Sequence, residues 1–197
     1  MYMMPNRLDR IRGRPWFTAA DAARALGIRR ASARVAVSRW CRRGLLHRLK
    51  NDFYVYAPDW PARSLEDRFR IAAFLRVPSY VSLQTALGYH GVSTQVQRGV
   101  VESVCLRRPS RHRAGPVEFR FHKTRPALFG GFSREDGFFI AAPEKALVDA
   151  VHLAEWGSYA LDTAALSLAR LDRRKLVAAL RPYPPQTVAA VRKLCRI

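Results

Sequence analysis

The sequence is poor in cysteine and has no long hydrophobic run. Its three cysteines, Cys41, Cys105 and Cys195, lie far apart in a chain of 197 residues and form no CxxC pair. An odd number at such spacing argues against a disulfide framework and against a zinc site, and is typical of a reducing compartment. No apolar segment approaches the length that crosses a bilayer, and the first residues lack the apolar core of a secretion signal. We therefore expect a cytoplasmic protein without a membrane partner.

Motifs of the common nucleic-acid enzymes are also missing. A nucleotidyltransferase holds magnesium with paired acids on one strand, and the sequence contains no Asp-x-Asp or Asp-x-Glu pair. It has no acid followed two residues later by lysine, no nucleophile elbow and no glycine-rich phosphate loop. His90, His112, His122 and His152 stand without a cysteine or an acid at metal-ligand spacing. We expect neither an enzyme nor a bound metal or other cofactor.

Acidic residues are scarce, whereas arginine is abundant. The chain has 35 lysines and arginines against 15 acids, which gives a formal net charge of +20. A folded chain carries such a charge most easily when its partner is a polyanion, and arginine pairs in two-pronged geometry with phosphate and with guanine edges. A GC-rich genome, which raises arginine everywhere, is the alternative explanation. Composition thus favours a nucleic-acid partner without proving one.

The pattern of a helix-turn-helix occupies the first part of the chain. Thr18 and Asp21 have the spacing of a capping box that begins one helix, and Gly27 ends that helix. We expect Ser32 to cap a second helix, which runs to Gly44. Two helices joined by a short glycine turn therefore open the chain.

A β-hairpin is predicted next, from runs at 45–49 and 53–56 around an Asn-Asp turn. Helix-turn-helix followed by hairpin is the order of a winged helix-turn-helix, which we assign to residues 1–58. A proline-bracketed break at 57–61 separates it from a second domain, residues 62–197.

The second helix has one apolar face and one basic face. Ala33, Val37 and Trp40 lie within about 60° of one another at 3.6 residues per turn, and we expect them to pack inward. The opposite face is predicted to enter the major groove of DNA, with the hairpin tip along the backbone or minor groove. A solvated arginine face on a structural helix is the alternative. The expected DNA-binding residues are Ser32, Arg34, Val35, Ser38, Arg39, Arg42, Arg48, Lys50 and Asn51.

The second domain mixes helices with a small sheet, so the predicted fold class is α+β. Strands are expected at 99–107, 117–122 and 138–141, and helices at 65–75, 82–89, 143–155, 161–169, 173–180 and 187–195. The stretch 107–113 is predicted as a basic loop. A second basic surface that would fit RNA is expected from Arg107, Arg108, Arg111, Arg113, Arg120 and Lys123.

Two further motifs are interpreted as packing rather than as functional surfaces. Residues 80–87 read as a buried helix capped by Ser82, and residues 143–149 as a helix start. In the second motif Lys145 and Asp149 are four residues apart and are expected to pair across one turn.

Five short segments together resemble the AbiEi family of antitoxins and autoregulators, from type IV toxin–antitoxin systems associated with abortive phage infection. The likeness spans about residues 14–155, and its segments are 17–21, 39–46, 53–55, 80–91 and 141–149. The resemblance implies that the winged helix-turn-helix binds repeats in its own promoter. It also implies that the second domain counters a nucleotidyltransferase toxin, without a stable complex between the two proteins.

Two features depart from the family pattern. Asp52 stands where the family's hairpin usually has glycine, and the tail after Glu155 does not match. A stand-alone regulator without a toxin, an RNA-interacting protein and a structure-directed nuclease are therefore the alternatives.

Overall fold

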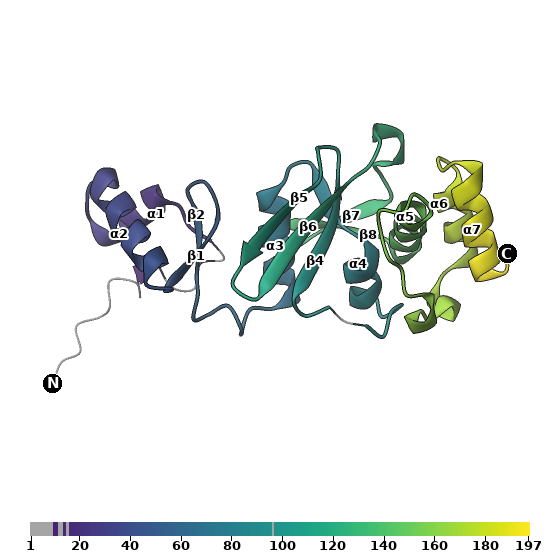
Figure 1. Cartoon of the computed structure of the whole chain (residues 1–197), viewed down its shortest axis with the longest axis horizontal. Coiled ribbons are helices and arrows are strands. Elements are labelled where there is room, and N and C mark those ends of the chain that lie inside the picture. The colour runs from purple at the N-terminus through teal and green to yellow at the C-terminus, as the bar shows by residue number, and fades with distance from the viewer. Residues whose placement is uncertain (1–9, 12–13, 15, 96) are drawn as a thin grey trace.

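The computed structural model describes residues 10–11, 14, 16–95 and 97–197. Figure 1 shows an elongated α+β molecule with a helical pair and a hairpin at one end. A six-stranded sheet occupies the middle, and the last two helices lie at the other end. Within the described ranges, no helix combines the length and the apolar character that a membrane crossing requires.

The first helix, α1 (Ala19–Leu26), begins and ends as predicted. The Asp21 amide donates to Thr18 Oγ1 at 3.1 Å, and the Thr18 amide donates to Asp21 Oδ2 at 2.9 Å. This reciprocal pair is the capping box. Gly27, with φ of +64°, then ends α1 in the left-handed conformation that glycine adopts without strain.

The second helix, α2 (Arg30–Arg42), starts earlier than predicted. Its N-cap is Arg29, whose carbonyl accepts from the Ala33 amide at 3.0 Å, and no side chain caps it. The prediction that Ser32 caps this helix is wrong; Ser32 lies in the first turn, because the helical hydrogen bonding already begins at Arg29. Gly44, with φ of +71°, stands just beyond the helix as expected.

A hairpin of β1 (Leu46–Lys50) and β2 (Phe53–Tyr56) follows, as predicted. The backbone of Phe17 pairs with that of Tyr54, with both N–H···O distances at 3.0 Å. This contact ties the segment before α1 to the hairpin. Together, α1, α2 and the hairpin have the arrangement of a winged helix-turn-helix, and we call residues 16–56 the winged-helix region.

The sheet has the strand order β5-β6-β4-β3-β8-β7. β3 is antiparallel to β4 and parallel to β8, and β4 is parallel to β6. The predicted strands correspond to β4, β6 and β8, while β3, β5 and β7 were not expected. The strands are β3 (Ser79–Val81), β4 (Val100–Cys105), β5 (Ser110–Ala114), β6 (Val117–Lys123), β7 (Phe132–Glu135) and β8 (Phe138–Ala141).

The prediction of a loop over 107–113 is wrong in its second half. Residues 110–114 pair antiparallel with β6 and form β5, the edge strand. Arg111 and Arg113 are exposed on this strand, whereas Ala114 is buried. Charged residues are common on edge strands because they oppose pairing with another chain, so a basic sequence is compatible with a strand there.

In the described part of the chain, five α-helices follow the hairpin and accompany the sheet. The predicted helices 65–75, 82–89, 143–155, 173–180 and 187–195 match them closely. Their bounds are α3 (Leu65–Leu75), α4 (Leu83–Tyr89), α5 (Pro143–Glu155), α6 (Arg173–Leu180) and α7 (Pro185–Cys195). α3 packs against β3, β4 and β8, while α5 contacts α4, α6 and α7.

The predicted helix at 161–169 is wrong. Only two short 3₁₀ turns form there, Thr163–Ala165 and Leu168–Arg170. The backbone of residues 165–167 pairs with residues 92–94 instead: the Ser167 amide donates to the Val92 carbonyl at 2.7 Å, and Ala165 O accepts from the Thr94 amide at 3.0 Å. These tertiary hydrogen bonds engage backbone amides and carbonyls that an α-helix would otherwise pair with one another.

Two buried clusters hold the fold together. The smaller one, inside the winged-helix region, includes Phe17, Ala33, Val37 and Leu46. The larger one surrounds the sheet and also takes in Leu49 and Val55 of the hairpin. The hairpin thus contributes to both clusters, and the division of the chain near residues 58–62 stays a prediction.

Candidate nucleic-acid interface

α2 presents the two faces that its sequence predicts. Ala33 and Val37 are fully buried, and Trp40 is half-buried. The predicted contact residues on this helix, Ser32, Arg34, Val35, Ser38, Arg39 and Arg42, are all exposed. Val35 is 51% exposed, which is high for a branched apolar side chain. Figure 1 shows α2 at the end of the molecule farthest from α6 and α7, so the sheet does not cover it.

The three arginines of this face have no internal partner among the described residues. Within the described ranges, no hydrogen bond or ion pair joins the guanidinium of Arg34, Arg39 or Arg42 to another residue. The helix itself contains no acidic residue. From Arg34 to Arg42 the axis rises about 12 Å at 1.5 Å per residue, which is about the width of the major groove of B-DNA. We call this face, residues 32, 34, 35, 38, 39 and 42, the α2 face.

The structure separates the three predicted hairpin contacts. Arg48 is exposed and donates to Asn51 Oδ1, so these two side chains lie together near the hairpin tip. Lys50 instead turns toward α3, where its Nζ donates to the Phe74 carbonyl at 2.9 Å. The same ammonium lies 4.7 Å from the ring centroids of both Phe53 and Phe74. Burial lowers the pKa of Lys50, and we remove this residue from the proposed contacts.

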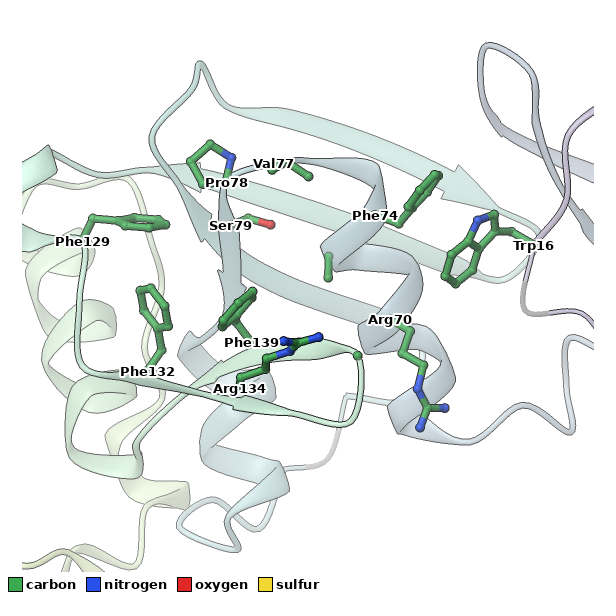
Figure 2. A pocket seen from close by; sticks show the side chains of 12 residues that line it. Trp16, Arg70, Phe74, Val77, Pro78, Ser79, Phe129, Phe132, Arg134 and Phe139 are labelled. Atoms are coloured by element: carbon green, nitrogen blue, oxygen red, sulfur yellow. The ribbon is translucent and has the colours of Figure 1, made fainter.

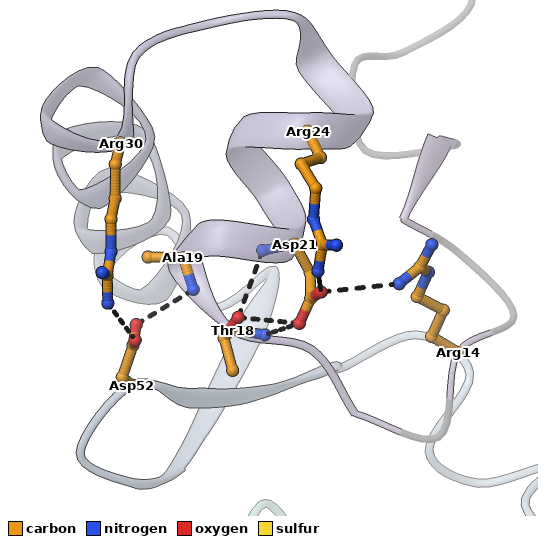
Figure 3. Close-up of polar contacts among 7 residues, drawn as sticks. All are labelled: Arg14, Thr18, Ala19, Asp21, Arg24, Arg30 and Asp52. Atoms are coloured by element: carbon orange, nitrogen blue, oxygen red, sulfur yellow. Dashed lines mark hydrogen bonds and ion pairs between the residues drawn. The ribbon is translucent and has the colours of Figure 1, made fainter.

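Asp52, at the hairpin tip, has a role that the sequence pattern did not indicate. Its φ of +59° is left-handed, the conformation that glycine adopts easily and aspartate tolerates better than most residues. Figure 3 shows its carboxylate accepting from the Ala19 amide, at 2.9 Å, and facing Arg30, whose Nη2 lies 3.3 Å from Oδ2. The tip of the hairpin is thereby fixed to the starts of both α1 and α2.

A second carboxylate holds the start of α1 in place. Arg24 lies 2.6 Å from Asp21 Oδ1, and Arg14 Nη1 lies 3.8 Å from the same atom, as Figure 3 shows. Hydrogen bonding from Thr18 and the neighbouring Arg24 hold the pKa of Asp21 below its usual value, although burial acts in the opposite direction. These pairs occupy Arg14, Arg24 and Arg30, whereas the arginines of the α2 face stay free of them.

Only part of the second predicted basic surface is exposed and available to a partner. Arg107, Arg108, Arg111, Arg113 and Lys123 are exposed. Arg120 is half-buried, and its Nε and Nη2 donate to Glu118 Oε2 at 3.0 and 2.7 Å. Arg111 lies opposite Arg120 in the strand pairing, with its Nε 3.9 Å from Glu118 Oε1. Since Arg120 is neutralised within the sheet, we remove it from this surface.

The pairing of Lys145 with Asp149 is confirmed, and it is buried. Lys145 Nζ lies 2.6 Å from Asp149 Oδ1 and also donates to the Leu128 carbonyl at 2.8 Å. Nζ contacts Tyr183 Oη as well. The Lys145 and Asp149 side chains are only 6% and 4% exposed. This motif is therefore part of the interior.

Hydroxyl groups complete the buried network around Asp149. Tyr80 and Ser82 donate to Oδ2, each at 2.9 Å, and Tyr183 donates to Oδ1 at 2.6 Å. Burial, together with the nearby carboxylate, raises the pKa of Tyr80 and of Tyr183, so both phenols stay protonated and donate. Ser82 is the N-cap residue of α4, as predicted, but its side chain makes no capping hydrogen bond and donates to Asp149 instead.

Cysteine, histidine and acidic residues supply no metal site in the part of the chain described. No three such side chains come together in a way that would hold an ion. Cys41, Cys105 and Cys195 are free thiols.

Comparison with known proteins gives the fold and nothing more specific. No protein-family model matches the chain, and no curated protein sequence does. The structure is similar to the crystal structure of the RV2827C protein from Mycobacterium tuberculosis, with a TM-score of 0.60 and 18% sequence identity. The superposition covers 98% of this chain and 78% of that one.

Proposed function

We propose that the protein is a DNA-binding transcriptional regulator that places α2 in the major groove of repeats in its own promoter. The observation that carries this proposal is the α2 face, in a helix without acids, on which Arg34, Arg39 and Arg42 are exposed and have no partner among the residues that the structure describes. Holding several positive charges close together without counterions costs free energy. A polyanion that binds there takes the place of those counterions. A DNA duplex supplies that polyanion, together with base edges that arginine reads.

Each part of the interface has a different task in this proposal. Arg34 and Arg39 contact guanine edges or phosphates, Ser38 contacts several bases, and Val35 packs against a thymine methyl. Ser32, in the first turn, donates to a phosphate near the positive end of the helix dipole. Arg42, Arg48 and Asn51 contact the backbone beside the groove and fix the register of the helix.

The antitoxin part of the proposal depends on the resemblance to the AbiEi family. In that reading, residues 62–197 counter a nucleotidyltransferase toxin encoded beside the gene, in the cytoplasm and without a stable complex. The chain itself would perform no catalytic step and hold no cofactor. A stand-alone regulator would share the α2 face but would have no toxin to counter.

DNA binding is tested by fluorescence anisotropy with the fragment upstream of the gene, for wild type, Arg34→Ala and Arg39→Ala. Each variant is expected to lose about 1–3 kcal/mol of binding free energy. Arg174→Ala, an exposed arginine on α6, is the matched control and keeps wild-type affinity. The logarithm of affinity should fall with the logarithm of salt by about 0.9 per phosphate neutralised. Equal affinity in all four proteins would remove α2 from the interface.

The antitoxin activity is tested separately. The neighbouring gene, if it encodes a nucleotidyltransferase, is expressed alone and together with this protein, and growth is measured. Rescue by wild type and by the Arg34→Ala variant would separate antitoxicity from DNA binding. If growth is not rescued, the regulator remains without the antitoxin.

An RNA partner is the second candidate, and the exposed side chains of Arg107, Arg108, Arg111, Arg113 and Lys123 favour it. These cations lie on and beside β5 and β6, away from α2. Filter binding of a duplex DNA and a structured RNA at equal salt distinguishes the two candidates. Preference for RNA, weakened by Arg111→Ala with Arg113→Ala and not by Arg34→Ala, would support the second.

A further inference from the structure

A half-open apolar pocket of about 500 Å³ lies between α3 and the β7–β8 pair. Five aromatic side chains from four separate segments line it: Trp16, Phe74, Phe129, Phe132 and Phe139. In Figure 2, Phe129 and Phe132 stand at one end, and Phe74 and Trp16 at the other. Phe139 and Arg134 lie between these ends. None of these residues belongs to the α2 face or to the second basic surface.

The aromatic walls are braced by one another, so the pocket is preformed. Trp16 stacks on Phe74 with a centroid distance of 4.7 Å. At the other end the Phe132 ring lies 5.3 Å from Phe129 and 5.6 Å from Phe139. Such pairs add to the stability gained by burying their area, which keeps the rings in place without a ligand.

The rim of the pocket leaves apolar surface in contact with water. Phe139 is 40% exposed and Val77, which also lines the pocket, is 65% exposed. Contiguous apolar surface of this kind, in a concave site, is typical of ligand-binding pockets, which commonly measure about 300–1,000 Å³. The size and lining therefore fit a small organic molecule with a flat apolar body.

The two arginines of the pocket differ in their charge balance. Arg70 donates to Asp67 Oδ1 at 2.8 Å and also pairs with Asp136, so acids already neutralise it. Arg134 lies directly across the strand pair from Phe139 and is exposed. No described residue forms a hydrogen bond or an ion pair with its guanidinium. The neighbouring Glu135 points to the other face of β7, since successive strand residues alternate.

We propose that this pocket binds a planar aromatic carboxylate of bicyclic or tricyclic size. Its rings would stack among Phe74, Phe132 and Phe139, and its carboxylate would accept two hydrogen bonds from the guanidinium of Arg134. A cationic ligand would be repelled by Arg134, and a neutral hydrocarbon would leave this arginine without a partner. The inference does not depend on the proposed DNA binding, because the pocket and the α2 face share no residue.

The test is calorimetric titration of the full chain with 2-naphthoate and with its neutral analogue 2-naphthamide. Wild type is expected to bind the carboxylate about tenfold more tightly than the amide, as a charge-assisted pair contributes roughly 1.5 kcal/mol or more. Arg134→Gln should remove that difference and leave binding of the amide unchanged. Arg113→Gln, an exposed arginine outside the pocket, is the matched control and should behave as wild type.

A pocket-filling variant tests the location independently of charge. Ala73 lines the pocket and is half-buried, so Ala73→Phe should abolish binding of both compounds. Circular dichroism and the urea midpoint establish that each variant is folded. If Ala73→Phe does not fold, Val77→Trp at the exposed rim takes its place.

Four results would overturn the proposal. They are no binding of either compound at millimolar concentration, binding that survives the filling variant, equal affinity for acid and amide in wild type, and equal losses in Arg134→Gln and Arg113→Gln. If self-association of the protein, measured by sedimentation, displaces 2-naphthoate, the pocket binds a second copy of the chain.

Discussion

The helices α2 and α5 have 13 residues each, and both carry charged side chains, but these side chains lie in opposite environments. On α2, Arg34, Arg39 and Arg42 face solvent, and no acid lies on the helix. On α5, Lys145 and Asp149 are buried, and the Lys145 ammonium donates to the Asp149 carboxylate. Tyrosine and serine hydroxyls donate to the same carboxylate. The charges of Lys145 and Asp149 are thus paired inside the protein, whereas the three arginines of the α2 face remain available to a partner.

The difference teaches how a basic residue is to be interpreted. A cation whose hydrogen bonds are all made within its own chain contributes to folding, and its removal lowers the free energy of unfolding. An unpartnered cation contributes little to folding, and its removal lowers the affinity for a binding partner instead. Lys50 and Arg48, two residues apart on β1, show a related difference: Lys50 donates to the Phe74 carbonyl, whereas Arg48 is exposed and donates to the neutral amide of Asn51.

The largest expected effect comes from Lys145→Met, which leaves the buried Asp149 without its cation. Breaking such a pair from one side typically costs about 3–5 kcal/mol. Urea unfolding followed by circular dichroism should show a loss of this size. Lys175→Met, an exposed lysine on α6, should change the free energy of unfolding by less than about 0.5 kcal/mol. Similar small losses in both variants would break the contrast between the helices.

A smaller effect is expected at Asp52, which fixes the hairpin tip to α1 and α2. Asp52→Gly keeps the left-handed backbone but removes the acceptor of the Ala19 amide and the partner of Arg30. Loss of a capping acceptor costs about 1 kcal/mol. Asp52→Asn retains an acceptor and should lose less than half of that in thermal unfolding. If the glycine variant is as stable as wild type, the carboxylate does not hold the hairpin.

The pH dependence of stability isolates the Asp21 contribution. Because its pKa is lower in the folded chain than the usual 3.8, its stabilising effect is complete above about pH 3.8. It is lost as the pH falls through the lower folded value. The unfolding free energies of wild type and Asp21→Asn should therefore differ by about 1 kcal/mol or less at pH 7, and converge in acid. A constant difference between wild type and Asp21→Asn from pH 7 into acid would contradict the assignment.

The smallest effect separates Arg48 from Lys50 in DNA binding. Arg48→Ala should reduce the salt slope by about 1 and weaken binding uniformly across sequences, as expected for one phosphate contact. Lys50→Met should leave the affinity and the salt slope unchanged, because the Lys50 ammonium donates to the Phe74 carbonyl and lies against the rings of Phe53 and Phe74. Anisotropy titrations at several salt concentrations measure both. A loss in slope with Lys50→Met alone would return this residue to the interface.

Local signals predicted much of the winged-helix region. The capping box of Thr18 and Asp21, the left-handed Gly27 and the two faces of α2 all depend on residues within one or two helical turns. The positions of Lys50 and Asp52 could not be predicted in this way. Their partners, Phe74 and Ala19, lie 24 and 33 residues away in the sequence.

The strands β3, β5 and β7 and the conformation of the segment 161–169 were also not predicted. β5 and β7 close the two edges of the sheet, and each is identified mainly by the strand that it pairs with. The segment 161–169 has helical residues, but hydrogen bonds to residues 92–94 determine its conformation. The aromatic pocket likewise brings together Trp16, Phe74 and Phe139, which no short sequence window contains.

By itself the sequence determined the α+β class, the order of helices and hairpin at the start of the chain, and a strong positive charge, because periodicity, capping and composition are local or additive properties. Only the tertiary structure decided which cations are free, since pairing with a distant carboxylate or carbonyl depends on the packing of separate segments. Packing of separate segments placed the Lys50 ammonium on the Phe74 carbonyl and buried the Lys145–Asp149 pair. It left Arg34, Arg39 and Arg134 without internal partners in the part of the chain that is described.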